Sequence, residues 1–421
     1  MLLTPDGYLP RTADGEVEAC LQSTPAVLIE GPRGCGKTWL GRRFARSQAQ
    51  LDDPDTRQVS EINPRGVLEG TTPRLLDEWQ SAPHIWNTMR HVCDEVGRMG
   101  QFLLTGSARP PDEETRHSGA GRVSRVRLRP MSLYESGDSA GRVSVAALLD
   151  GAEVGFARSG RDLDDIVTLA CRGGWPPVVG LAPDAAQRYM RSYLTEVVRT
   201  DVPRLDGRRR DPGGVSRLLA SLGRNAGTGI SKRSLGRDID PEHPMDGRTV
   251  GAYLDALQRL FVVEESPAWT PHLRSRTPQR RPVKRYLADP ALMVAALEAG
   301  PARFAGDTRS LGMLFETLVV RDLRIYAEAC GCRPISYYRD DSGLEVDAVL
   351  QRRDGAWIAV EVKLGGETLV EAGAEALLKL RERIDDRRIG EPSRLVVVTA
   401  VGYAYDRPDG VSVVPITDLA P

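Results

Sequence analysis

Residues 31–38 have the residue types and spacing of a phosphate-binding loop. In order they are Gly31, Pro32, Arg33, Gly34, Cys35, Gly36, Lys37 and Thr38, which fits the pattern G-x-x-x-x-G-K-[ST]. The glycines allow backbone N–H groups to surround phosphates, and the start of a following helix adds partial positive charge. Lys37 is expected to reach the β- and γ-phosphates of ATP, and Thr38 to hold Mg²⁺. The alternative is a plain glycine turn between a strand and a helix.

Two later strand ends carry side chains that could complete an ATP-hydrolysing site. Asp77 and Glu78 follow two leucines, so Asp77 could bind Mg²⁺ through water while Glu78 polarises the attacking water. Residues 102–107 form an apolar run that ends in hydroxyls and resembles the sensor strand of AAA-type ATPases. Either Thr105 or Ser107 could then position the water beside the nucleotide. The alternative is an ordinary strand ending.

A second set of acidic and lysine side chains lies near the C-terminus. Alternation along one expected strand places Glu361 and Lys363 on one face, and along another it pairs Glu345 with Asp347. If these strands are neighbours, the acids and the lysine come together. Glu316 falls on the apolar face of a helical segment, where a carboxylate needs a cation or a hydrogen-bond partner.

The order of these residues resembles the PD-(D/E)xK nuclease superfamily. In that superfamily carboxylates bind magnesium, and the lysine orients or activates water for phosphodiester hydrolysis. The resemblance implies that Glu316, Asp347 and Glu361 hold Mg²⁺ or Mn²⁺, ions that oxygen ligands suit, and that Lys363 is catalytic with them. The alternative is that Glu361 and Lys363 form a surface charge pair and Glu316 is a satisfied core acid.

The elements that must position these residues can be placed along the chain. The first 135 residues alternate apolar runs with helical segments, which is typical of a parallel α/β layer. The strands are expected at 26–30, 75–77, 102–105 and 123–128, with a helix at 39–49. Residues 136–203 are expected to be helical and without strands. Residues 299–421 return to α/β, with a helix at 311–329, strands around 335–339, 344–350, 357–363 and 394–399, and a helix between the last two.

The middle of the chain has the order of a winged helix. A helical segment from Ser231 leads to a second one with apolar residues at helical spacing, and then to a strand-like end at Phe261. Residues 274–285 carry six basic side chains and no acid, which predicts a wing that contacts the phosphates of nucleic acid, most simply DNA. The alternatives are a solvated loop or a surface that docks on the other domains.

Composition restricts the class of protein. The molecule has 421 residues and a net charge of −1, so nucleic-acid binding needs a local basic patch. No apolar run approaches the roughly 18 residues that span a bilayer, and the first residues lack a secretory pattern, so no membrane partner is expected. The scattered cysteines favour a reducing, cytoplasmic location over a structural zinc site. Only five of the 57 basic residues are lysine: Lys37, Lys232, Lys284, Lys363 and Lys379.

As a whole the chain resembles prokaryotic AAA-type ATPases whose C-terminal half is domain of unknown function 4143. The stretches that carry the resemblance are GPRGCGKT, LLDEWQ, FLLTGSA, GRVSRVRLRPMSLYE, GGWPP, VVRTDVPRL, KRYLADPAL, FETLVVRDL, YYRDDSGLEVDAVL and WIAVEVKLG. The resemblance implies a multidomain α/β protein. Its parts are a P-loop AAA-type core at 1–135, a helical lid at 136–203, a winged-helix-like domain at 204–298 and a restriction-endonuclease-like domain at 299–421.

Two arginines match recurrent positions of this family. Arg122 follows Gly121, and Arg199 precedes Asp201. Either could be an arginine finger that binds the nucleotide of a neighbouring subunit, which would require a homo-oligomer. The alternative for each is an ion pair with a nearby acid, Asp201 in the case of Arg199. Trp175 departs from the family, where tyrosine or phenylalanine is expected.

These patterns together favour an ATP-binding and ATP-hydrolysing, DNA-associated protein with a magnesium-dependent nuclease domain. The rival interpretation is an ATP-dependent switch that regulates DNA or partner contact, in which the nuclease-like domain is inactive. A third is a motor that acts on protein partners.

Overall fold

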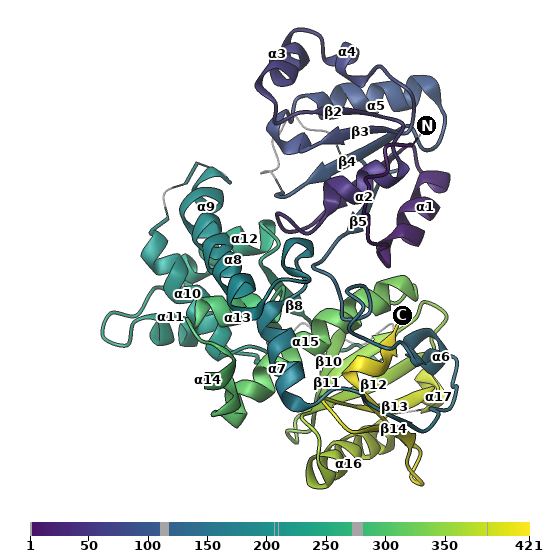
Figure 1. Ribbon diagram of the computed structural model, residues 1–421, viewed down its shortest axis with the longest axis vertical. Helices are drawn as coiled ribbons and strands as arrows, with labels where there is room; N and C mark the ends of the chain where they lie inside the picture. The colour runs from purple at the N-terminus through teal and green to yellow at the C-terminus, as the bar shows by residue number, and fades with distance from the viewer. Residues whose placement is uncertain (1, 110–117, 206, 209, 272–280, 385) are drawn as a thin grey trace.

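The computed structural model describes residues 2–109, 118–205, 207–208, 210–271, 281–384 and 386–421. Figure 1 shows three lobes. The N-terminal lobe (purple to blue) contains the phosphate-binding loop, the middle lobe (teal to green) is mostly helical, and the C-terminal lobe (mainly green to yellow) is built on a second sheet.

The N-terminal lobe is a five-stranded parallel sheet in the order β2-β3-β4-β1-β5. Its strands are β1 (Ala26–Glu30), β2 (Ser47–Gln50), β3 (Arg74–Asp77), β4 (Phe102–Gly106) and β5 (Val123–Arg127). The helices around them include α1 (Ala13–Ser23), α2 (Lys37–Phe44), α3 (Pro54–Ile62), α4 (Pro64–Leu68) and α5 (Ile85–Val96). Every residue of β1 and β4 is buried, because helices cover both faces of a parallel sheet. The expected parallel layer is confirmed.

One element of this lobe differs from the prediction. The helix after the loop ends at Phe44, not near residue 49, and Ser47–Gln50 pairs with β3 as the edge strand β2. An edge strand contacts only one neighbour and can carry polar residues, so this short segment had no apolar run to reveal it.

The segment at 136–203 is only partly helical, contrary to the prediction of a helical lid. Strand β6 (Val143–Ser144) pairs with β16 (Leu419–Ala420), and β7 (Ala157–Arg158) pairs with β14 (Tyr403–Asp406). Residues 143–158, including α6 (Val145–Leu149), therefore pack with the C-terminal lobe. Two-residue strands leave no periodic signal and form only because a partner edge is present.

The middle lobe contains the rest of that segment and the expected helix, helix and hairpin. Its helices include α7 (Leu163–Arg172), α8 (Pro183–Glu196), α9 (Val202–Arg204), α10 (Pro212–Arg224), α11 (Lys232–Ile239), α12 (Gly247–Arg259), α13 (Pro290–Ala296) and α14 (Pro301–Ala305). Strands β8 (Val263–Ser266) and β9 (Lys284–Leu287) form an antiparallel hairpin. Helix α13 packs against α7, α8 and α10, so these helices share one core. The winged-helix assignment remains a prediction.

The C-terminal lobe is a mixed sheet in the order β10-β11-β12-β13-β15-β14-β7. Its own strands are β10 (Ser336–Arg339), β11 (Glu345–Gln351), β12 (Trp357–Lys363), β13 (Arg394–Thr399), β14 and β15 (Val411–Pro415). Helix α15 (Thr308–Ala329) covers one face, α16 (Glu367–Arg383) covers the other, and the short α17 (Asp386–Ile389) follows. The expected strands and helices of this lobe are confirmed, and β11 lies antiparallel to β12 with Ala348 opposite Val360.

Within the described residues, no helix combines the length and apolar character needed to cross a bilayer.

Candidate functional site

The loop at 31–38 joins the carboxyl end of β1 to the start of α2, as expected of a phosphate-binding loop. Gly34 and Gly36 have φ values of 73° and 104°, which only glycine adopts without strain. The ammonium of Lys37 is buried and donates to the carbonyl of Pro32 at 2.9 Å. The lysine is thus held within the loop, where an incoming phosphate would offer it a stronger acceptor.

Asp77 lies at the end of β3 beside the loop. Its Oδ1 accepts hydrogen bonds from Oγ1 of Thr38 at 3.0 Å and from Oγ1 of Thr105 at 2.5 Å. Burial raises the pKa of Asp77, and the two hydroxyls oppose that shift. The three side chains predicted to surround Mg²⁺ and the reacting water are therefore in contact.

Glu78 has a left-handed backbone, with φ of 53°, at the strand end. Its amide donates to Oγ1 of Thr105 at 3.0 Å, and Ser107 donates to its Oε2 at 3.0 Å. Gln80 bonds to the same carboxylate oxygen and to Ser107. Thr105 thus fixes the backbone of Glu78, while Ser107 and Gln80 orient its carboxylate. Such an acceptor could polarise a water molecule.

The loop borders a cavity of about 640 Å³ that reaches beyond the N-terminal sheet. Its lining includes Lys37, Thr38, Asp77 and Glu78. The remaining lining residues include Gly7, Tyr8, Leu9, Arg11, Trp39, Met131, Pro176 and Pro177. These groups fit a nucleoside triphosphate with Mg²⁺: a buried ammonium (Lys37), the glycines of the loop, a hydroxyl (Thr38) and a carboxylate (Asp77). The cavity is completed by the GGWPP turn, which comes from the segment between α7 and α8.

Trp175 of that turn contacts the loop directly. Its Nε1 donates to the carbonyl of Arg33 at 2.9 Å, and its ring is fully buried against Tyr193. Arg33 also forms an ion pair with Asp201 at 3.2 Å. Phenylalanine and tyrosine, which the family is expected to have at this position, lack the ring N–H group that makes this hydrogen bond.

Arg11 belongs to the site but was missed by the sequence analysis. Nη1 donates to the carbonyl of Cys35 at 3.0 Å, Nη2 to the carbonyl of Arg129 at 2.8 Å, and Nε to Glu135 at 3.1 Å. Both Arg11 and Glu135 are buried, and although burial opposes it, Arg11 lowers the pKa of Glu135. No local motif surrounds Arg11, so only the tertiary contacts identify it.

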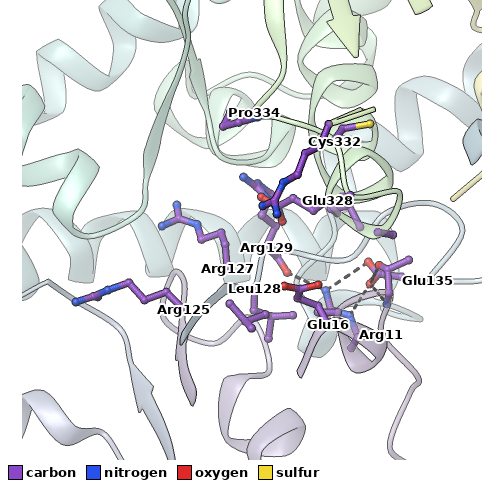
Figure 2. A pocket seen from close by; sticks show the side chains of 17 residues that line it. Arg11, Glu16, Arg125, Arg127, Leu128, Arg129, Glu135, Glu328, Cys332 and Pro334 are labelled. Carbon is purple, nitrogen blue, oxygen red and sulfur yellow. Dashed lines mark hydrogen bonds and ion pairs between the residues drawn. The ribbon is translucent and has the colours of Figure 1, made fainter. Parts of the chain in front are cut away.

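The segment at 129–135 links this site to the other lobes. Arg129 forms ion pairs with Glu264 of β8 at 2.9 Å and with Glu328 near the end of α15 at 2.7 Å. Figure 2 shows Arg11 and Glu135 pointing toward one another, with Arg129 and Glu328 close by, around a cavity of about 500 Å³. Burial would raise the pKa of Glu264, yet Arg129 and its neighbouring arginines hold it well below the usual range.

Two backbone amides of residues 129–135 also bond to the other lobes. The amide of Met131 donates to the carbonyl of Gly174 at 2.6 Å, and the amide of Leu133 donates to Asp322 of α15 at 2.9 Å. A Cβ on Gly174 would lie 2.0 Å from the carbonyl oxygen of Met131. The close approach therefore requires glycine at this position.

Arg122 does not lie at the nucleotide loop of its own chain. Its guanidinium pairs with Asp94 at 2.8 and 3.1 Å, and its carbonyl accepts from the amide of Ala26 at the start of β1. The loop follows the opposite end of β1, roughly 17 Å along a five-residue strand. The pair with Asp94 agrees with the alternative of an ion pair with a nearby acid. A role of Arg122 as an arginine finger for the nucleotide of a neighbouring subunit remains a prediction.

Arg199 lies beside a cavity of about 250 Å³ between α8, α10 and α13. Asp201, the ion-pair partner that the alternative gave to Arg199, pairs with Arg33 instead. A role of Arg199 as an arginine finger remains a prediction.

The predicted carboxylates of the C-terminal lobe do come together, but around a lysine. Nζ of Lys284 lies 2.7 Å from Glu345, 3.4 Å from Asp347 and 3.6 Å from Glu316. Lys284 is 2% exposed and comes from β9 of the middle lobe. Burial opposes its charge, but the carboxylates outweigh that effect and raise its pKa.

Glu316 is covered by the middle lobe. Tyr286 of β9 donates to its Oε1 at 2.7 Å, and a Cβ on Gly227 would lie 2.5 Å from the same oxygen. Burial and the charge of Asp347 raise the pKa of Glu316 to about 7, against the pull of Lys284. The carboxylate has the cation and hydrogen-bond partners that its apolar surroundings require, which agrees with the alternative of a satisfied core acid.

Glu361 and Lys363 belong to β12, and they lie next to Asp347 of the neighbouring strand β11. Nζ of Lys363 is 2.5 Å from Oε2 of Glu361, and the amide of Val362 donates to Oδ2 of Asp347 at 3.0 Å. Burial, with Asp347, raises the pKa of Glu361 to about 8, although Lys363 opposes the shift. The pair is buried on the glutamate side and is not a surface charge pair.

These residues do not fit a divalent metal in this arrangement. Among the described residues, no three His, Cys, Asp or Glu side chains are placed to hold a metal ion together. The ammonium of Lys284 lies between Glu316 and Asp347, where two of the three predicted ligands would meet the metal. The predicted site at Glu316, Asp347 and Glu361 is therefore not formed as a metal centre.

The predicted basic wing lies mostly outside the described residues, which omit 272–280. Its described end contacts the protein itself: Arg281 pairs with Asp341, Arg285 pairs with Glu265 at 2.9 Å, and Lys284 is buried. These contacts agree with the alternative of a surface that docks on the other domains.

Comparison with known families divides the chain into three matched regions. Residues 23–137 match the family model of an AAA domain, 311–419 match domain of unknown function DUF4143, and 163–303 match domain of unknown function DUF8612. The chain is thus similar to an AAA domain in its N-terminal part and to DUF4143 in its C-terminal part.

Comparison with individual proteins gives further matches. The chain is 26% identical over 347 residues to the uncharacterized proteins Rv2008c of Mycobacterium tuberculosis and Mb2031c of Mycobacterium bovis. The match covers 81% of this chain and 71% of each relative. Among solved structures, the Walker-type ATPase PABY2304 of Pyrococcus abyssi matches at 16% identity and a TM-score of 0.42, over 70% of this chain and 97% of that one.

Proposed function

We propose that this protein is an ATP-dependent switch, in which nucleotide binding at residues 31–38 sets the contacts of the middle and C-terminal lobes. The observation that carries the proposal is that the nucleotide cavity is lined by parts of more than one lobe. A nucleotide that fills such a cavity binds one lobe arrangement better than another, and this difference in affinity shifts the equilibrium between them.

The chemistry assigned to the N-terminal lobe follows from its contacts. On binding of the triphosphate, Lys37 would exchange the carbonyl of Pro32 for phosphate oxygens. Bound Mg²⁺, held by Thr38 and Asp77, would neutralise charge on the phosphates. Glu78, oriented by Ser107, would accept a proton from the attacking water, and Thr105 would keep the strand end in place.

The route to the other lobes passes through residues 129–135. Arg11 bonds to both the loop and this segment, and Arg129 then contacts the hairpin of the middle lobe and the end of α15. A shift of the loop backbone on nucleotide binding would therefore act on buried ion pairs. Such pairs have a strong orientation dependence, so small movements change their energy.

Catalytic residues of the ATPase can be tested by measuring ATP affinity and hydrolysis for wild type, Lys37→Ala and Glu78→Gln. We expect Lys37→Ala to lose ATP binding. Glu78→Gln should bind ATP within about threefold of wild type but hydrolyse it at least about 100-fold more slowly. Glu69→Gln, at an exposed position, is the matched control. Wild-type hydrolysis by Glu78→Gln would overturn the assignment.

A second candidate function is a DNA-associated nuclease, favoured by the convergence of Asp347, Glu361 and Lys363. It predicts Mn²⁺-dependent cleavage of single- or double-stranded DNA or RNA that disappears in Asp347→Ala and Lys363→Ala. Cleavage with these properties would show that the C-terminal lobe is an enzyme. Its absence, with ATP hydrolysis intact, would leave the switch.

A further inference from the structure

The carboxylate cluster of the C-terminal lobe already contains a cation, and that cation belongs to another lobe. Lys284 is the first residue of β9, and it places its ammonium within 3.6 Å of three carboxylates. Cation and carboxylates come from three elements, β9, α15 and β11. A protein ammonium thus takes the place that the sequence assigned to a divalent metal.

We infer that Lys284 is the resident counter-ion of this cluster, so that metal binding at Glu316 and Asp347 and docking of the β8–β9 hairpin on the C-terminal lobe exclude each other. The inference does not depend on ATP or on the proposed switch. It concerns which cation, the protein's own or a metal, neutralises the acids.

The geometry of the cluster indicates that Lys284 and a metal ion cannot bind these carboxylates at the same time. The ammonium of Lys284 lies within hydrogen-bond distance of Glu345 and Asp347 and forms a longer ion pair with Glu316 at 3.6 Å. Mg²⁺ binds oxygen at about 2.1 Å in a near-octahedral shell and would need the same carboxylate oxygens. A second cation beside the ammonium would meet like-charge repulsion in a buried site, where it is only weakly screened.

The docked hairpin also closes the cluster. The backbone of Lys284 pairs with Ser266 of β8, its side chain lies 5.3 Å from the ring centre of Tyr337, and it is 2% exposed. Tyr286 and Gly227, from the same lobe, cover Glu316. A metal could bind Glu316 and Asp347 only where the ammonium of Lys284 is absent, either because the hairpin has moved away or because the lysine has been replaced.

Mn²⁺ binding to the nucleotide-free, full-length protein tests the inference, with free Mn²⁺ measured by electron paramagnetic resonance. The test variants are Lys284→Met and the charge-balanced pair Lys284→Met/Glu345→Gln, which removes one cation and one anion. We expect both to gain one Mn²⁺ site that is at least about tenfold tighter than any in wild type. The added site should disappear when Asp347→Asn is included.

The control is Lys232→Met, the same change at an exposed lysine of the middle lobe, which should bind Mn²⁺ as wild type does. Circular dichroism would show that each variant is folded, and the charge-balanced pair serves if Lys284→Met is not. Two results would overturn the inference. One is an Asp347-dependent Mn²⁺ site in wild type as tight as that of the variants, and the other is a folded variant that gains no site.

Discussion

Nη1 of Arg11 donates to the carbonyl oxygen of Cys35, inside the phosphate-binding loop, at 3.0 Å. The same guanidinium bonds to the carbonyl of Arg129 and to Glu135, so one buried side chain joins the nucleotide site to the segment on which the other lobes converge. A nucleotide-dependent change in this protein should pass through that contact.

Replacement of Arg11 by glutamine should destabilise the protein and weaken ATP binding. The change leaves the buried carboxylate of Glu135 without its cation, which costs about 3–5 kcal/mol of unfolding free energy for a buried ion pair. Urea denaturation measures the loss. Arg65→Gln, which breaks the exposed pair with Glu95, should change stability by about 0.5 kcal/mol or less. Equal stabilities of the two variants would contradict the role of Arg11.

Gly174→Ala tests the close contact between the GGWPP turn and the junction segment. The new Cβ would lie 2.0 Å from the carbonyl oxygen of Met131, so the backbone must shift, at a cost of about 1–3 kcal/mol. Gly155→Ala adds the same methyl group in open space and is the control. The urea midpoint should fall only for Gly174→Ala, and a midpoint equal to that of the control would argue against the contact.

The sequence predicted most elements of the fold because their signals are local. The apolar runs of β1 and β4 and the alternation of β12 each predict a strand without knowledge of its neighbours. Strands β6 and β7 could not be predicted, since two residues carry no periodicity and each depends on the edge of a distant partner.

The same distinction applies to the sites. Residues 31–38 form a contiguous motif, whereas Lys284 falls in a basic run that resembles a solvated wing. Its burial depends on Glu316, Glu345 and Asp347, which follow it in sequence by tens of residues. One signal was available: lysine is rare in this chain, and Lys37 and Lys363 both fall inside motifs.

Stability should depend on pH through Glu361. Its pKa rises from 4.5 to about 8 on folding, so between these values the native protein binds more protons than the unfolded chain. The free energy of unfolding therefore falls as the pH rises through this window. In Glu361→Gln this contribution is absent, and the fall should be smaller by an amount on the order of a few kcal/mol.

Urea denaturation of wild type and Glu361→Gln at intervals from about pH 5 to 9 measures the difference. Glu375→Gln changes an exposed glutamate that pairs with Lys379, and should follow the wild-type curve. Parallel curves for wild type and Glu361→Gln would show that Glu361 is ionised in the native protein throughout.

Arg122→Ala separates an ion pair from an arginine finger. The pair with Asp94 is exposed, so the loss of stability should be about 0.5 kcal/mol or less. ATP hydrolysis should stay within about twofold of wild type, because removing an arginine finger costs far more, about 10³-fold or greater. A large difference in hydrolysis rate between wild type and Arg122→Ala, which increases with protein concentration, would instead assign Arg122 to the nucleotide site of a neighbouring subunit.

Hydrogen–deuterium exchange with and without Mg²⁺ and a slowly hydrolysed ATP analogue tests the coupling between nucleotide and lobes most directly. In wild type, the analogue should change exchange at 31–38 and also at 129–135 and in β8. In Arg11→Gln, at saturating analogue, the change at 31–38 should remain and the distant changes should disappear. Changes confined to the nucleotide site in wild type would contradict the proposed switch.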